Sequence, residues 1–102
     1  MPGYTYVWEF EVAEGRVDDF RHAYGPHGTW VQLFRGAPGY VRTELYRHCE
    51  RPNRFVTIDP WESESAWLAF RAGHAAEYDA LDAQCADLTL SEAEIGRFER
   101  VE

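Results

Sequence analysis

The sequence predicts an α+β fold in which one four-stranded antiparallel sheet carries its helices on a single face. Three observations predict it. The hydrophobic spacing alternates between strand and helix periods in the order β, α, β, β, α, β. A tight Glu-Arg-Pro-Asn connection at 50–53 predicts a hairpin between the second and third strands. No repeat or linker interrupts this order, so we expect one domain over residues 1–102 with the ferredoxin-like βαββαβ topology.

The first third of the chain predicts one strand and two short helices. Residues 4–12 alternate regularly, and the residues on one face are Tyr4, Tyr6, Trp8, Phe10 and Val12. From Arg16 the apolar spacing is helical, and the Gly-Pro-His-Gly stretch at 25–28 must interrupt that helix, because proline has no N–H to donate. Thr29 is the expected N-cap of the next helical segment.

Three further strands are expected beyond the two short helices. The second strand should run from about Tyr40 to Cys49, with Tyr40 and Thr43 on opposite faces. The third should run from Arg54 to Trp61. A weaker fourth strand is expected from Ala93 to Val101, with a bulge at Gly96.

One stretch, residues 55–82, dominates the pattern, since it starts as a strand and continues as a long amphipathic helix. Ser63 is the expected N-cap of that helix, and Gly73 is expected to kink or divide it. One helical stripe consists of Trp67, Phe70, His74, Tyr78, Leu81, Cys85 and Leu88. Such a stripe forms either the wall of a pocket or, more commonly, part of a core, and both interpretations stay open at this point.

The charge of the chain excludes several classes of function. Ten arginines against 18 acidic residues give a net charge of −8, and no basic run occurs, so we expect neither nucleic acid nor membrane as a partner. The absence of lysine excludes Schiff-base and pyridoxal-phosphate chemistry and the P-loop. Cys49 and Cys85 are expected to be free thiols, and without a signal peptide we expect a cytoplasmic protein.

The predicted sheet carries apolar and aromatic residues on both faces. We expect that Tyr4, Trp8, Tyr40 and Tyr46 cannot all lie beneath two helices. The other face of the sheet would then need a cover, and a second copy of the chain is the simplest one. The sequence therefore predicts a homodimer in which the two sheets pack face to face.

The segment GYVRTELYRHCERPNRFVTIDPWESESAW, residues 39–67, carries a resemblance to a known family. Strand two starts with Pro-Gly-Tyr, the hairpin contains Pro and Asn, and strand three ends in Trp-Glu-Ser-Glu before an aromatic helix. Together with the element order, this resembles the antibiotic biosynthesis monooxygenase (ABM-type) family of dimeric α/β barrels, over essentially Tyr4 to Val101. The resemblance implies the fold, whereas members of this superfamily include quinone-forming oxygenases, haem degraders and isomerases.

The resemblance assigns expected roles to a few positions. In the anthrone-type oxygenases, which use no metal or flavin, a strand-three Trp belongs to the pocket, and Trp61 matches it. Their Asn four residues earlier corresponds to Thr57 here, and their helix Tyr six residues later to Trp67. The haem-degrading branch needs a strand-one Asn and a helix Trp, but Asn53 is the only Asn and Phe70 takes the place of the Trp. The resemblance therefore favours chemistry without a cofactor.

Cofactor-free oxygenation needs a base, a donor to the developing oxyanion and a dry aromatic cavity. His74 is the first candidate base, because an imidazole accepts a proton near neutral pH; the alternative is a histidine satisfied by a nearby carbonyl or carboxylate. Tyr78, one turn later, is the candidate oxyanion donor. Asp59 is the alternative acid or base if it is buried, and otherwise caps the turn after its strand.

The remaining candidate residues would bind the substrate, a small aromatic or hydrophobic molecule. The rings expected to stack on it are those of Trp8, Trp61, Trp67 and Phe70. Arg42 is expected either to contact an anionic substrate or to pair with a carboxylate. We expect no metal, because the pairs of helical His and acidic residues lack a third ligand.

Two other functions remain open. One is a non-catalytic protein that sequesters a hydrophobic ligand or serves in a stress response, and the other is a domain whose cavity is filled by rings and supports only a dimer. An open cavity that reaches His74 would favour the oxygenase or the binding protein, and a packed interior would favour the third possibility.

Overall fold

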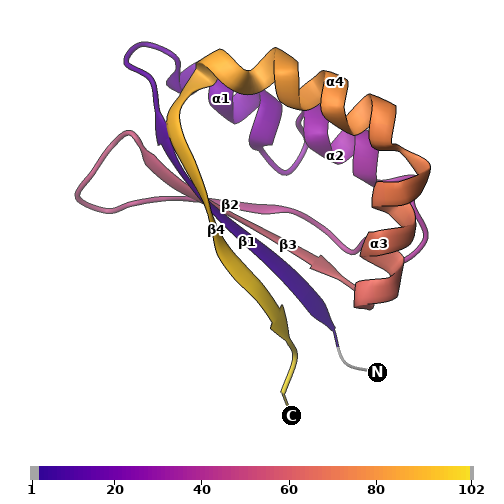
Figure 1. Cartoon of the computed structure of the whole chain (residues 1–102). Helices are drawn as coiled ribbons and strands as arrows, with labels where there is room; N and C mark the ends of the chain where they lie inside the picture. Colours follow the sequence, from indigo (N-terminus) through magenta and orange to yellow (C-terminus); the bar gives the residue numbers. More distant parts are fainter. Residues whose placement is uncertain (1–2, 102) are drawn as a thin grey trace.

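The four strands form one antiparallel sheet in the order β2-β3-β1-β4, and all helices lie on one of its faces (Figure 1). The computed structural model describes residues 3–101. The elements in chain order are β1 (Tyr4–Val12), α1 (Val17–Tyr24), α2 (Thr29–Phe34), β2 (Glu44–Arg47), β3 (Arg54–Trp61), α3 (Glu64–Gly73), α4 (Ala75–Cys85), the 3-10 turn η1 (Ala86–Leu88) and β4 (Thr89–Glu99). The predicted α+β, ferredoxin-like fold is confirmed.

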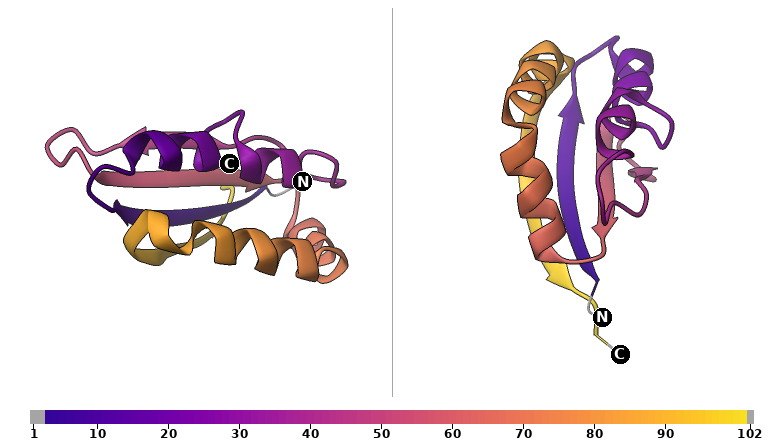
Figure 2. Two further views of the ribbon diagram at one scale, coloured as in Figure 1. Left: turned by 90° about the horizontal axis from the view of Figure 1, so that it is seen from above. Right: turned by 90° about the vertical axis from the view of Figure 1, so that its right-hand side faces the viewer.

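The helices form two rows above the sheet, with α1 and α2 in one row and α3 and α4 in the other (Figure 2). The Gly-Pro-His-Gly stretch at 25–28 separates α1 from α2, as predicted. Gly28 is the N-cap of α2 and no side chain caps it, so the prediction that Thr29 is the N-cap is wrong. Each row therefore consists of two segments, which lets the helices cover a long sheet.

The row of α3 and α4 begins and divides where the sequence predicts. The Ser63 hydroxyl accepts a hydrogen bond from the Ala66 N–H at 3.1 Å and caps α3. The helix ends at Gly73, and His74, with φ −129° and ψ 29°, separates α3 from α4. Figure 1 shows that α3 changes direction relative to α4 at this break.

The second strand is shorter than predicted. The strand covers only Glu44–Arg47, and Tyr40 contacts β3 through a single isolated bridge to Trp61. Residues 41–43 lie outside the ladder, so the strict alternation fails there. As a result Tyr40 and Thr43, which were expected on opposite faces, are joined through their hydroxyl groups at 2.8 Å.

The fourth strand begins at Thr89, four residues earlier than predicted, and ends at Glu99. It is an exposed edge strand, so its hydrophobic alternation is weak and its start is hard to find in the sequence. Gly96 pairs with Val7 and Glu94 with Trp8, which leaves Ile95 as the extra residue of a bulge. The bulge thus lies one residue from its predicted position at Gly96.

The core is built largely from aromatic side chains between the sheet and the two rows of helices. Its buried rings are Tyr4, Phe10, Phe20, Tyr24, Trp30, Phe34, Phe55, Trp61, Trp67 and Phe70. Trp8 and Tyr40 pack against this core, and Tyr4 is part of it. Three of the four rings named from the sequence therefore lie on the helix side. The fourth, Tyr46, pairs with Val56 and lies on the opposite face, so the four rings do not all lie beneath the helices, as expected.

The opposite face of the sheet has no helix over it among residues 3–101 (Figure 1). Pairing with β1 and β3 places Tyr46 and Phe98 on that face, and about half of each side chain is exposed. Both cysteines are free, Cys49 exposed and Cys85 buried. No helix within the described residues is long and apolar enough to cross a bilayer.

Candidate active site

A cavity of about 220 Å³ lies between the sheet and the helices. Nine of its lining residues are aromatic: Tyr6, Trp8, Phe10, Tyr24, Trp30, Phe34, Trp61, Trp67 and Tyr78. The other five are polar or acidic: Thr43, Thr57, Asp59, Asp82 and Glu92. The cavity is therefore a mostly apolar space with a few polar groups, which is typical of a small-molecule site.

The strand period explains how the sheet contributes to this wall. Alternate residues of β3 share one face, so Thr57, Asp59 and Trp61 all point to the helix side. In the same way β1 contributes Tyr6, Trp8 and Phe10. The helices close the cavity from above with Trp30 of α2, Trp67 of α3 and Tyr78 of α4.

The aromatic wall is held by edge-to-face packing. The ring of Trp67 meets Tyr6 at 5.1 Å and 90° and Trp61 at 5.4 Å and 68°. Trp30 meets Tyr78 at 5.0 Å and 65°. Each such pair contributes about 0.5–1.5 kcal/mol beyond the burial of its surface. Rings fixed on several sides in this way form a preorganised wall.

Two indole N–H groups of this wall are buried and have no acceptor among the described residues. They belong to Trp30 and Trp61, whose side chains are 6 % and 1 % exposed. A buried donor without an acceptor costs about 1–3 kcal/mol. Such groups commonly persist at functional sites, where a ligand or water supplies the acceptor.

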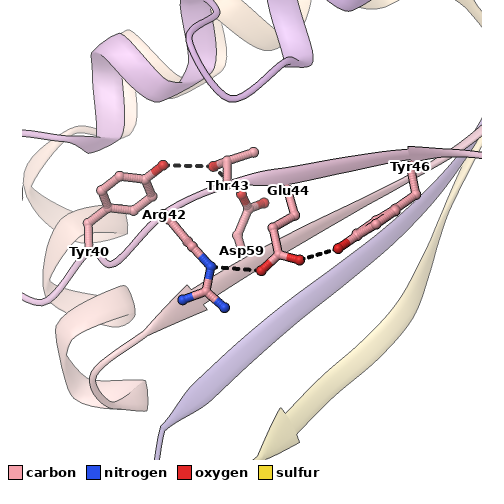
Figure 3. Close-up of polar contacts among 6 residues, drawn as sticks. All are labelled: Tyr40, Arg42, Thr43, Glu44, Tyr46 and Asp59. Atoms are coloured by element: carbon pink, nitrogen blue, oxygen red, sulfur yellow. Dashed lines mark hydrogen bonds and ion pairs between the residues drawn. The ribbon is translucent and has the colours of Figure 1, made fainter.

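Asp59 is the end of a short chain of hydrogen bonds (Figure 3). The Thr43 hydroxyl donates its proton to the Asp59 carboxylate at 2.5 Å. Because that hydroxyl has one proton, the Tyr40 hydroxyl must be the donor in its 2.8 Å contact with Thr43 Oγ1. The order Tyr40 to Thr43 to Asp59 fixes the carboxylate in the cavity wall, so Asp59 does not serve as a simple cap of the following turn.

Burial raises the pKa of Asp59 to about 6, and the hydrogen bond from Thr43 partly opposes that rise. At pH 7 the group is therefore mostly ionised, yet it accepts a proton far more readily than an exposed aspartate does. A pKa just below the working pH is the range in which a carboxylate acts as a general base.

Tyr78 lies on the opposite side of the cavity and remains a hydrogen-bond donor. Burial raises its pKa to about 12, and Arg71 opposes the rise. The Arg71 guanidinium lies 4.0 Å from the centre of the Tyr78 ring and pairs with Asp79 at 3.2 Å. A neutral phenol in this position can donate to an oxygen atom that gains negative charge.

Five of the eight predicted site residues line the cavity: Trp8, Asp59, Trp61, Trp67 and Tyr78. Phe70 packs behind the wall against Trp61 at 5.4 Å without lining it. Arg42 is exposed and pairs at 2.7 Å with Glu44, the first residue of β2, so it is not placed to contact a ligand in the cavity. Of the two roles expected for Arg42, contact with an anionic substrate or pairing with a carboxylate, the structure shows the pairing.

His74 is the main correction, because it does not line the cavity. The break after Gly73 leaves it between α3 and α4, where its ring stacks on Phe70 at 4.9 Å. Its Nδ1 lies 3.2 Å from the carbonyl oxygen of Phe70. It borders a separate shallow groove with residues such as Ser63 and Glu62. The imidazole therefore has the alternative role expected for it, that of a histidine whose ring nitrogen is paired with a nearby backbone carbonyl.

Several cavity residues were not singled out from the sequence. Trp30 follows a helical apolar spacing, and such spacing also fits a core residue. Thr43 lies where the strand alternation fails. Asp82 is one helical turn after Tyr78, and that spacing was a usable signal. Glu92 belongs to the part of β4 that the sequence did not predict as strand.

No group of three or more His, Cys, Asp or Glu side chains within residues 3–101 is arranged to hold a metal ion. The cavity chemistry of the protein itself therefore consists of carboxylates, hydroxyls, indole N–H groups and rings.

A family model described as antibiotic biosynthesis monooxygenase (ABM) matches residues 3–80. The chain belongs to the ABM family. The matched span includes the Asp59, Trp61 and Tyr78 of the cavity, whereas Asp82 and Glu92 lie beyond it. No curated protein is similar enough in sequence to match this chain.

Solved structures share the fold of this ABM domain. SnoaB from Streptomyces nogalater, described as a cofactor-independent oxygenase, is 24% identical with a TM-score of 0.74, over 100% of this chain and 96% of that one. A protein from Bordetella bronchiseptica is 19% identical with a TM-score of 0.79, over 100% of both chains. At these identities the likeness establishes the fold.

Proposed function

We propose that this ABM domain is a cofactor-independent monooxygenase that oxidises a small aromatic or quinol-like molecule with O₂. The observation that carries the proposal is Asp59, a carboxylate with a raised pKa, held by Thr43 in the wall of an aromatic cavity. Membership of the ABM family supports it, as does the fold shared with SnoaB, which is described as such an oxygenase.

The proposed reaction begins with a proton transfer. A phenol bound between the rings would give its O–H proton to the Asp59 carboxylate, and the electron-rich anion would lie against the aromatic wall. Tyr78 would donate a hydrogen bond to the oxyanion. The candidate base is therefore Asp59, in place of His74, which does not line the cavity.

Oxygen then enters the reaction directly. The anion transfers one electron to O₂, and the resulting pair of radicals forms a carbon–oxygen bond to give a peroxide. The peroxide takes back the proton from Asp59 and loses water, which leaves a carbonyl on the ring. One atom of O₂ ends in the product and the other in water, so a phenol with an unsubstituted ring position gives a quinone and the electrons balance.

The chain from Asp59 through Thr43 to Tyr40 supports the proton transfer steps. The two hydroxyl groups direct their protons toward Asp59, so they would hold the carboxylate in place while it accepts the substrate proton and returns it to the peroxide.

The proposed functional unit is one domain over residues 1–102 that pairs with a second copy through the uncovered sheet face, in the cytoplasm. Tyr46 and Phe98 support the pairing, because they leave apolar surface exposed on that face. The helices already cover Tyr4, Trp8 and Tyr40, so the apolar area that drives the pairing is smaller than the sequence suggested.

The second candidate function is a binding protein that sequesters a hydrophobic ligand, and the preformed cavity favours it equally. The possibility of a cavity filled by its own rings is not supported, because about 220 Å³ remains open. Oxygen uptake separates the two remaining candidates.

The experiment measures O₂ consumption with a panel of anthrones and hydroquinones, after dialysis against a chelator. An oxygenase gives uptake above the rate without protein, and with ¹⁸O₂ it places one labelled atom in the product. Binding of the same compounds, detected by calorimetry, without any uptake would contradict the oxygenase and leave the binding protein.

A further inference from the structure

The cavity wall carries three carboxylates and, among its lining residues, no arginine or histidine. Asp59 lies within the wall, while Asp82 of α4 and Glu92 of β4 are exposed. None of the three forms an ion pair within residues 3–101. The cavity therefore presents negative charge on the side where α4 meets β4.

The arginines nearest to this wall are directed to other partners. Arg71 pairs with Asp79 at 3.2 Å, and Arg97 lies 3.7 Å from Glu94. Burial raises the pKa of Glu92, and the negative charge of Asp82 raises it further. Two like charges beside an apolar cavity repel each other unless a cation comes between them.

The rings of the cavity point independently to a cation. The faces of tryptophan and tyrosine rings carry negative potential and bind ammonium groups, and Trp8, Trp30 and Tyr78 line this cavity. Trp30 and Trp61 also line the cavity, and their buried indole N–H groups have no acceptor among the described residues, so a ligand oxygen or a water would complete them. No cluster of described side chains suits a metal ion, which favours an organic cation.

We propose that the cavity takes an aromatic compound with an alkylammonium side chain, with the ammonium group beside Asp82 and Glu92 and a ring oxygen directed to the inner wall. The proposal rests on the proposed function in so far as this cavity is the substrate site. It narrows the substrate class to phenols or quinols that carry an aminoalkyl side chain. Asp82 and Glu92 lie outside the span matched by the family model, so the family match does not by itself predict this preference.

The test compares three probes that share the naphthalene ring and carry a cationic, a neutral or an anionic substituent at the same position: 1-naphthylmethylammonium, 1-naphthalenemethanol and 1-naphthoate. Their binding is measured by calorimetry at pH 7.5 and low salt, conditions in which screening is weak. We expect the ammonium probe to bind about tenfold tighter than the alcohol or more, and the carboxylate probe to bind weakest.

The double variant Asp82→Asn, Glu92→Gln should abolish the preference of the ammonium probe over the alcohol. Both side chains are exposed, so the variant is expected to fold. Glu77→Gln is the matched control, because Glu77 is an exposed acid of α4 that does not line the cavity. The control should keep the full preference.

Equal binding of the ammonium and alcohol probes, tighter binding of the carboxylate probe, or no binding of any probe would overturn the proposal. A retained preference in the double variant would also overturn it. The outcome is distinct from that of the oxygen-uptake test. If the ammonium probe binds preferentially but no aminomethyl-hydroquinone supports oxygen uptake, the oxygenase proposal fails and the ligand class stands. If neutral quinols support uptake but the ammonium and alcohol probes bind equally, the ligand class fails and the oxygenase proposal stands.

Discussion

At the scale of single residues, the chemistry depends on how one carboxylate is held. Asp59 combines burial, which raises its pKa to about 6, with a short hydrogen bond from Thr43, which opposes the rise. Neither effect is visible in the Ile-Asp-Pro sequence around it. A strand residue of this type is equally compatible with a turn cap, and only the position of Thr43 in space distinguishes the two roles.

The first prediction concerns the base itself. Asp59→Asn keeps the shape of the side chain but removes its ability to accept a proton, so we expect kcat for oxygen uptake to fall by about 10²–10⁴-fold. In the unaltered protein the rate should rise with pH through about 6 and then level off, because the ionised form is the active one.

The control for this substitution is Asp87→Asn, an exposed acid that does not line the cavity. It should leave both the rate and its pH dependence unchanged. A loss of less than tenfold in Asp59→Asn, with the fold intact by circular dichroism, would remove Asp59 from the proton transfer.

The second prediction concerns Thr43. Thr43→Val removes the hydroxyl that stabilises the ionised Asp59, so the pKa of Asp59 should rise further. The acidic limb of the pH–rate profile should then move to higher pH. Thr43→Ser keeps the hydroxyl and should restore the original limb. An unchanged limb in Thr43→Val would show that the hydrogen bond does not control the base.

At the scale of elements, strands with unbroken alternation were predictable to the residue. Both β1 and β3 begin and end where the sequence placed them, because each alternates on a half-buried sheet surface. The length of β2 was overestimated, since the chain leaves the ladder at 41–43. The length of β4 was underestimated, since nearly all residues of this edge strand are exposed and the hydrophobic alternation is weak. The Ser63 cap and the helix division at Gly73 were also predictable, because both act locally, whereas the expected Thr29 cap is absent.

The third prediction compares two glycines in different elements. Gly39 has φ +89°, and a Cβ there would lie 2.5 Å from the Cβ of Ala66, so Gly39→Ala should lower the free energy of unfolding by more than about 1 kcal/mol. Gly73 ends α3, and a Cβ there meets no described atom within 4 Å. Gly73→Ala should therefore raise the free energy of unfolding by about 0.5–1 kcal/mol.

Urea unfolding followed by fluorescence measures both changes. If Gly73→Ala proved as destabilising as Gly39→Ala, the break between α3 and α4 would depend on the glycine itself. The position of Tyr78 at the cavity would then depend on it as well.

At the scale of the whole molecule, the sequence identified most of the cavity rings but placed the histidine wrongly. A helical stripe assigns Trp67, His74 and Tyr78 to one face only if the helix is continuous. The division at Gly73 was predicted, but its effect on the stripe depends on the angle between α3 and α4, which is set by tertiary packing. For the same reason the acidic side of the cavity was not visible, since Asp82 and Glu92 come together only in the fold.

The fourth prediction concerns the proposed pairing of two sheets. Phe98→Asp places a charge on the uncovered face and should convert a dimer to a monomer in sedimentation velocity. Leu68→Asp is the control, because Leu68 is similarly exposed but belongs to α3 on the other side of the sheet. A dimer that survives Phe98→Asp, or a monomer in the unaltered protein, would contradict pairing through this face.

The space enclosed by the rings has a thermodynamic consequence. Because the same tryptophans and tyrosines form both the hydrophobic core and the lining of the cavity, an occupant would complete the packing of the folded chain and find no equivalent site in the unfolded one. At a hundred times its dissociation constant, such an occupant adds about 2.7 kcal/mol to the unfolding free energy. The melting temperature therefore reports binding in the cavity, even for a compound that the protein does not convert to a product.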